Sequence, residues 1–191
     1  MSRKELYFFR NLQRRIDVVH ILLTGGIQVG KTTIIKKFLL QSGLSADGFM
    51  TYWETDDDGD RRLYLSMYST DTASGERHLL ARSIGGSHSQ SEKVSRVFDE
   101  YGAAILNSSG IRDIIIMDEL GILESEAADF QHAVLRHMAG SVPVLGVIKP
   151  RKTRFLDTVR AQSNVTVREV TVYNRDSVLS WLLEENIASV R

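Results

Sequence analysis

The amino-acid sequence predicts an α/β domain of three layers, in which helices cover both faces of a mainly parallel sheet. Along most of the 191 residues, short apolar segments of strand length alternate with amphipathic segments of helix length, as in parallel α/β domains. A glycine-rich loop at residues 25–30 joins the first of these strands to the first helix. The order of strand, glycine loop and helix is one that α/β domains use to bind phosphate groups.

The first strand and the first helix have clear local signals. Residues 18–24 are predicted to form a buried strand, because most of them are leucine or β-branched and two glycines end the run. From Lys31 onward, apolar residues recur three and four positions apart, which is the spacing of a helix with one buried face. Gly43 follows the last of them, at a position where glycine often ends helices.

A β-hairpin insertion is predicted next. Residues 48–54 and 63–68 have strand-like composition, and the second segment alternates leucine and methionine with tyrosine and serine. Four aspartates and a glycine lie between them at residues 56–60, which predicts an exposed turn. Residues 69–92 are rich in serine, glycine, threonine and histidine without a sustained period, and we expect a loop there.

The second half of the chain alternates more regularly. A short strand around residues 94–97 is predicted to precede a helix that passes through Tyr101 and Ile105. Further strands are expected at 111–118, 142–148 and 165–171, and helices at about 125–139, 153–162 and 174–186. We expect one domain over residues 17–191, preceded by a basic extension at residues 1–16 that is either a helix packed on the domain or a docking segment.

The composition excludes several classes of function. Lysine plus arginine and aspartate plus glutamate number 24 each, so we expect neither a specific nucleic-acid partner nor a membrane partner. Cysteine is absent, which removes disulfides and thiol chemistry. The apolar runs are far shorter than the roughly 20 residues that cross a bilayer, and arginines interrupt the N-terminal segment. We therefore expect a cytoplasmic protein.

The glycine-rich loop fits the phosphate-loop pattern of glycine, four residues, glycine, lysine, and serine or threonine. Its glycines allow backbone amides to close around phosphate oxygens, and the helix that follows adds its positive dipole end. Lys31 would neutralise the β- and γ-phosphates, and Thr32 would hold Mg²⁺ through its hydroxyl. The predicted phosphate-binding residues are Gly25, Gly26, Ile27, Gln28, Val29, Gly30, Lys31, Thr32 and Thr33.

An apolar strand ends in two carboxylates, Asp118 and Glu119. Ligands of doubly wound sheets lie at the carboxyl ends of strands, so we expect Asp118 to orient Mg²⁺ and Glu119 to act as the general base. Glu124 is a second candidate base, or an acidic residue in the first turn of the next helix. Residues 118–121 also match the Asp-x-x-Gly of GTPases, but the chain has no Asn-Lys-x-Asp guanine motif, which disfavours a regulatory GTPase.

Two further segments follow strands that end near the predicted phosphate site. Residues 149–154 hold four cations, and Arg151, Lys152 or Arg154 would be able to reach the γ-phosphate. In the segment after the last strand, Asn174 either caps a helix or contacts the nucleotide base. Arg175 is a second candidate base contact in that segment.

With these motifs in order, residues 18 to about 186 resemble the small P-loop nucleoside triphosphatases of the cancer-related nucleoside-triphosphatase type. The resemblance is carried by residues 25–33, by 48–51, by 118–121 with Glu124, and by 171–176. It implies slow Mg²⁺-dependent hydrolysis of ATP, GTP and other nucleoside triphosphates, with loose base selection. The chain departs from the usual family pattern at residues 26–28, at Val147 and at residues 77–82.

Three functions are compatible with these residues. The first is a nucleoside triphosphatase that converts nucleoside triphosphates to diphosphates, with broad base specificity. The second is a nucleoside or small-molecule kinase, suggested by the 69–92 segment and the basic 149–154 segment. The third is a nucleotide-dependent binding module, suggested by the basic N-terminal segment.

Overall fold

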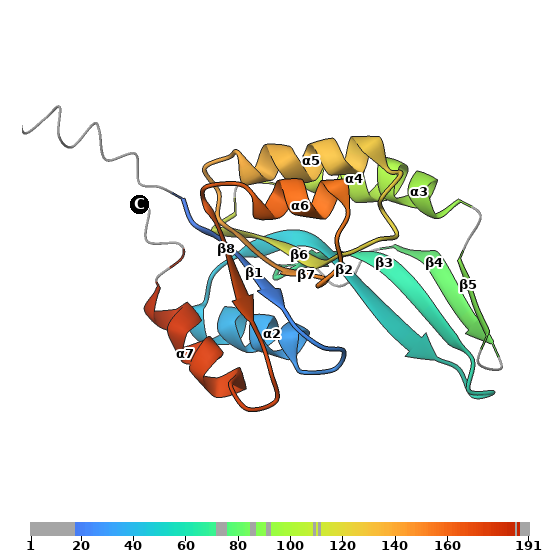
Figure 1. The fold of residues 1–191 in the computed structure, drawn as a ribbon, viewed down its shortest axis with the longest axis horizontal. Coiled ribbons are helices and arrows are strands. Elements are labelled where there is room, and N and C mark those ends of the chain that lie inside the picture. Colours follow the sequence, from blue (N-terminus) through green and yellow to red (C-terminus); the bar gives the residue numbers. More distant parts are fainter. Residues whose placement is uncertain are drawn as a thin grey trace, which may run out of the picture.

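In the residues that the structure describes, the chain folds around an eight-stranded sheet with strand order β5-β4-β3-β2-β6-β7-β1-β8 (Figure 1). The computed structural model describes residues 18–71, 76–84, 87–90, 93–108, 110, 112–185 and 187. The predicted N-terminal extension therefore lies outside the described residues. The elements are β1 (His20–Thr24), α2 (Lys31–Ser42), β2 (Ala46–Thr55), β3 (Arg61–Ser69), β4 (Arg77–Ile84), β5 (Ser87–Gln90), α3 (Val94–Val97), the π-helical turn η1 (Phe98–Gly102), α4 (Ala103–Ser108), β6 (Ile114–Leu120), α5 (Ala128–Met138), β7 (Val144–Ile148), α6 (Arg154–Arg160), β8 (Val165–Glu169) and α7 (Arg175–Glu184).

Five neighbouring strands of the sheet are parallel, and the other three form an antiparallel extension. β2, β6, β7, β1 and β8 run in one direction. β3, β4 and β5 each pair antiparallel with the strand before them. The predicted mainly parallel sheet and the predicted hairpin are both confirmed. Since β1 and β6 are parallel, the loops that follow them emerge at the same edge of the sheet.

Helices cover both faces of the sheet, which confirms the three-layer arrangement (Figure 1). α2 and α7 lie together on one face, over apolar residues of β1, β6 and β7. α5 and α6 cover the other face together with η1 and α4, where Phe49, Phe98 and Phe130 pack against one another. The two apolar cores hold the sheet rigid between them, which is the condition for placing loops accurately at its edge.

Two secondary-structure predictions were wrong. Residues 77–84 and 87–90 of the predicted loop form β4 and β5. Their mixed composition suits strands that extend a sheet beyond its core, although Leu80 and Ala81 are buried. The predicted strand at 94–97 is helical, because Val94 and Phe98 stand four residues apart and both enter the core.

The remaining predicted elements are present with shifted ends. β6 continues to Leu120, two residues beyond the predicted end. Asp118 pairs with Val147 and Leu120 with Ile148, and Glu119 lies at the register shift between them. The peptide bond between these two residues is cis. In the part of the chain that the structure describes, no helix has the length and apolar character needed to cross a membrane.

Candidate active site

The phosphate loop connects the end of β1 to the start of α2 and is shaped by its glycines. Gly30 is the N-cap of α2 with a φ of 98°, and no side chain caps the helix. Gly25 has a φ of 133°, and a Cβ added there would lie 2.2 Å from the carbonyl oxygen of Val170. The loop therefore requires glycine at both positions, and the uncapped amides of the first helical turn are available to an anion.

The Lys31 side chain turns back over its own loop. Its Nζ donates to the carbonyl oxygens of Gly26 at 2.6 Å and Gly25 at 3.1 Å. The first turn of α2 contains no acidic residue, so the ammonium group and the helix dipole both present positive charge at this end of the helix. This combination suits the binding of phosphate groups at the loop.

Asp118 is placed opposite the phosphate loop. β7 lies between β1 and β6, with Val147 in register with Leu23 on one side and with Asp118 on the other. The Asp118 side chain is 4% exposed and its carboxylate accepts a hydrogen bond from the Thr32 side chain. Burial raises the pKa of Asp118 to about 6, while the Thr32 hydrogen bond and the Lys31 charge act in the opposite direction.

Glu119 forms an ion pair with Lys149, the residue that follows β7. Lys149 Nζ lies 2.8 Å from Glu119 Oε1, and the two side chains are 38% and 26% exposed. Solvent can therefore reach the Glu119 carboxylate, as a general base that activates water requires. Lys149 was not singled out from the sequence, although it is the first of the four cations that directly follow the predicted strand at 142–148.

Glu124 lies in the turn that follows β6 and is only 1% exposed. Its Oε1 accepts a short hydrogen bond from the backbone N–H of Gly121. Burial raises the pKa of Glu124 to about 7, against the lowering effect of the Gly121 hydrogen bond. In this position the carboxyl group holds the 121–124 turn in shape.

The alternative interpretation of Glu124, as an acidic residue in the first turn of a helix, is wrong. Helix α5 begins at Ala128, four residues later. Asp129 is the acidic residue in the first turn of α5, and Asp99 Oδ1 from η1 accepts from the amides of Asp129 at 2.9 Å and Phe130 at 3.1 Å.

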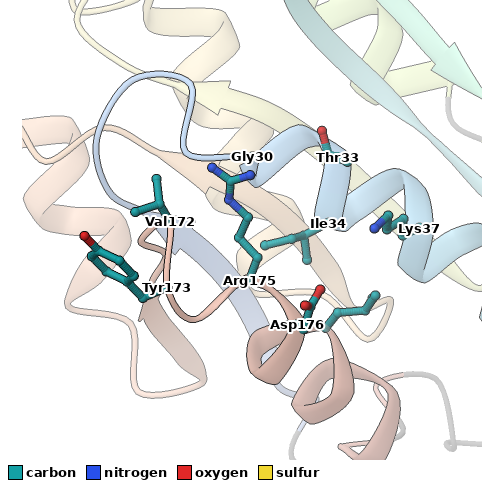
Figure 2. Close-up of a pocket in the computed structure, with 9 residues that line it drawn as sticks. Gly30, Thr33, Ile34, Lys37, Val172, Tyr173, Arg175 and Asp176 are labelled. Carbon is teal, nitrogen blue, oxygen red and sulfur yellow. The ribbon is translucent and has the colours of Figure 1, made fainter.

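A cavity of about 320 Å³ lies beside the phosphate loop, between α2 and the loop that precedes α7 (Figure 2). The Arg175 side chain lies over the loop: a Cβ added at Gly30 would be 3.4 Å from its Cδ and Nε. Tyr173 at the rim is 96% exposed. The cavity is lined by Gly30, Thr33, Ile34, Lys37, Val172, Tyr173, Arg175, Asp176 and Leu179.

Asn174 supports the loop between β8 and α7. Its Oδ1 accepts from the Thr171 amide at 2.8 Å, and its Nδ2 donates to the Glu169 carbonyl at 3.0 Å. Asn174 occupies the N-cap position of α7, but its side chain makes no cap hydrogen bond with the helix. The predicted side-chain cap is therefore absent, and the amide group instead shapes the wall of the cavity.

The basic segment after β7 divides into two parts. Lys149 faces the acidic strand end, as described above. Arg151, Lys152 and Arg154 are exposed, and Arg154 begins α6, whose N-cap Thr153 accepts from the Leu156 amide at 3.1 Å. Contact of these three cations with a γ-phosphate stays a prediction.

This fold, with a phosphate loop after β1 and an acidic strand end opposite it, defines a P-loop nucleotide-binding protein. A model of the family described as NTPase matches residues 20–183. The chain therefore belongs to this family of small P-loop nucleoside triphosphatases, as its motifs predicted.

Relatives and solved structures agree with this assignment. The chain is 31% identical to the nucleoside-triphosphatase THEP1 of Thermotoga maritima, over 85% of this chain and 92% of that protein. It is 32% identical to a cancer-related nucleoside-triphosphatase homolog of Bos taurus, over 84% and 92%. The crystal structure of THEP1 from Aquifex aeolicus superposes with a TM-score of 0.67 at 25% identity, covering 87% of this chain and 98% of that one. The solution structure of a human cancer-related nucleoside triphosphatase has a TM-score of 0.64 at 28% identity, covering 91% and 99%.

Proposed function

We propose that this protein is a nucleoside-triphosphate phosphohydrolase, which converts ATP, GTP and other nucleoside triphosphates to the diphosphate and inorganic phosphate. The observation that carries the proposal is the contact between Thr32 at the start of α2 and Asp118 at the end of β6. This contact joins the phosphate-binding loop to the acidic strand end at one point. Relatives named nucleoside-triphosphatase support the same activity.

The residues at this point suit a magnesium ion. Mg²⁺ prefers oxygen ligands and is often held by one or two protein oxygens together with substrate phosphates and water. The Thr32 hydroxyl and the buried Asp118 carboxylate offer such oxygens, and the two side chains interact with each other. Bound Mg²⁺ would neutralise charge on the β- and γ-phosphates.

The remaining groups of the site suit an in-line attack of water on the γ-phosphorus. The amides of residues 25–33 and the Lys31 ammonium would hold the phosphate chain. Glu119 would accept a proton from the attacking water as its oxygen bonds to phosphorus. The bond between the γ-phosphorus and the bridging oxygen then breaks, and the nucleoside diphosphate leaves with the electron pair.

Glu124 acts indirectly in this proposal. Because its carboxyl group is buried on the Gly121 amide, it would position the 118–121 segment rather than meet the water itself. Glu119 is the better candidate for the general base, since its carboxylate is partly exposed.

The cavity beside the loop is the proposed site of the nucleoside. Thr33 and Arg175 line it next to the phosphate loop, and the Tyr173 ring is free to stack on a base. Stacking does not discriminate strongly among bases, which suits broad base specificity. Asn174 would act by shaping this wall, since both ends of its amide bond to the backbone.

The test is phosphate release from ATP, GTP, CTP and UTP, with and without Mg²⁺. Glu119→Gln should lower kcat by about 100-fold or more, the usual scale for loss of a general base. Glu126→Gln, at an exposed position in the following turn, is the matched control and should keep normal turnover. Normal turnover by Glu119→Gln would rule out Glu119 as the base.

The kinase and the binding-module interpretations gain no support from the relatives, which are named as triphosphatases. An acceptor compound that takes up the γ-phosphate in place of water would favour a kinase. The cytoplasmic location and the lack of nucleic-acid and membrane partners stay predictions from the sequence.

A further inference from the structure

Lys149 occupies a position between the two halves of the proposed active site. It follows β7, and β7 lies between β1, which leads into the phosphate loop, and β6, which carries Asp118 and Glu119. Its ammonium group is the partner of the Glu119 carboxylate at 2.8 Å. The Lys149 ammonium therefore lies directly against the carboxylate of the proposed general base.

The backbone of Lys149 is held on both sides. Its N–H donates to the Leu120 carbonyl at 2.9 Å. Its carbonyl accepts from the Arg151 amide at 2.8 Å and from the Arg160 guanidinium at 2.5 Å. These bonds fix the start of the side chain, so that only the four-carbon stem and the ammonium group are free to move.

The stem of Lys149 lies across Gly121. A Cβ added at Gly121 would be 3.1 Å from Lys149 Cδ and 3.7 Å from its Nζ. Glycine at position 121 thus leaves the space in which the lysine lies, and the ammonium is kept beside the 118–124 segment. The Lys149 charge also acts on the buried carboxyl group of Glu124, whose pKa it lowers against the stronger effect of burial.

We propose that Lys149 is a further catalytic residue, which exchanges its Glu119 partner for the γ-phosphate when a nucleoside triphosphate binds. This inference rests on the proposed triphosphatase function. A partly exposed ion pair contributes little to stability, so a γ-phosphate at the loop competes effectively for the ammonium. The exchange frees Glu119 to accept the proton of water and places positive charge where the transferred phosphoryl group carries negative charge.

The exchange also explains how the site would distinguish substrate from product. A nucleoside diphosphate has no γ-phosphate to draw Lys149 away, so Glu119 stays paired while the product is bound. Lys149 therefore contributes to binding of the triphosphate and not to binding of the diphosphate.

The test compares wild type, Lys149→Met and the control Lys93→Met, which changes an exposed lysine at the start of α3, away from the proposed site. The measurements are kcat for ATP hydrolysis and the dissociation constants of MgADP and of a non-hydrolysable ATP analogue with Mg²⁺. Lys149→Met should lower kcat by about tenfold or more, as expected for loss of a charge-stabilising group. It should weaken analogue binding severalfold and leave MgADP binding within twofold of wild type, while Lys93→Met changes none of the three.

A second measurement needs no variant. In wild type, the rate of reductive methylation of Lys149, followed by mass spectrometry, should fall severalfold with the ATP analogue but not with MgADP, and Lys93 should be labelled equally in both. Equal labelling of Lys149 in the two complexes would overturn the proposal, as would unchanged kcat in Lys149→Met. If wild type hydrolyses ATP and Lys149→Met does so equally well, only the role of Lys149 fails. If wild type hydrolyses no triphosphate, the proposed function fails and the role of Lys149 fails with it.

Discussion

The buried carboxyl group of Glu124 should make the stability of this protein depend on pH. Glu124 is 1% exposed, and its carboxyl group accepts a hydrogen bond from the Gly121 amide. Burial raises the pKa of Glu124 from 4.5 to about 7. Glu124→Gln keeps the size of the side chain and an oxygen that can accept from Gly121, but it cannot ionise. The variant therefore isolates the effect of charge.

The sign and size of the effect follow from the two pKa values. The folded protein holds the Glu124 proton more tightly than the unfolded chain, so this contribution to stability is present below pH 4.5 and is lost as the pH rises to about 7. At about 1.4 kcal/mol per pKa unit, the full loss is about 3 kcal/mol. Between pH 5 and pH 8, wild type should lose about 2 kcal/mol more of its free energy of unfolding than Glu124→Gln does.

Urea denaturation at pH 5 and pH 8, without nucleotide and with a chelator present, measures this difference. Glu126→Gln is the control, because Glu126 is exposed in the same turn and its substitution should leave the pH dependence of wild type unchanged. If wild type and Glu124→Gln lose the same stability between the two pH values, the buried carboxyl group does not carry the predicted penalty.

Three further outcomes are expected from the structure. Lys31→Ala should weaken binding of triphosphates by tenfold or more in a titration with a fluorescent nucleotide, because the loop loses its ammonium group; unchanged affinity would contradict the role of the loop. Gly25→Ala should abolish triphosphate binding and lower the melting temperature, because the added Cβ would lie 2.2 Å from the Val170 carbonyl oxygen. Gly59→Ala is the control and should keep triphosphate binding intact, because its added methyl group meets open space. Asp99→Ala should lower the free energy of unfolding by about 1–2 kcal/mol, because two amides at the start of α5 lose their acceptor, and Asp99→Asn should recover most of the loss in urea denaturation.

The parts of the fold that local patterns could predict are those with a buried face of their own. β1, α2 and the β2–β3 hairpin were predicted because their apolar spacing and their bounding glycines are local signals. β4 and β5 were missed because a strand in this position is held mainly by pairing with its neighbour, and its side-chain pattern is weak. The helix α3 was mistaken for a strand because four residues are too few to separate the two periods.

The features of the candidate site also fall into those that local sequence predicts and those that depend on the tertiary structure. The sequence by itself determined the phosphate loop, because the left-handed glycines and the start of α2 are properties of adjacent residues. It also placed Asp118 and Glu119 at a strand end. Only the tertiary structure decided that Thr32 meets Asp118, that Lys149 pairs with Glu119 and that Glu124 is buried, because each of these depends on which strands lie side by side in the sheet.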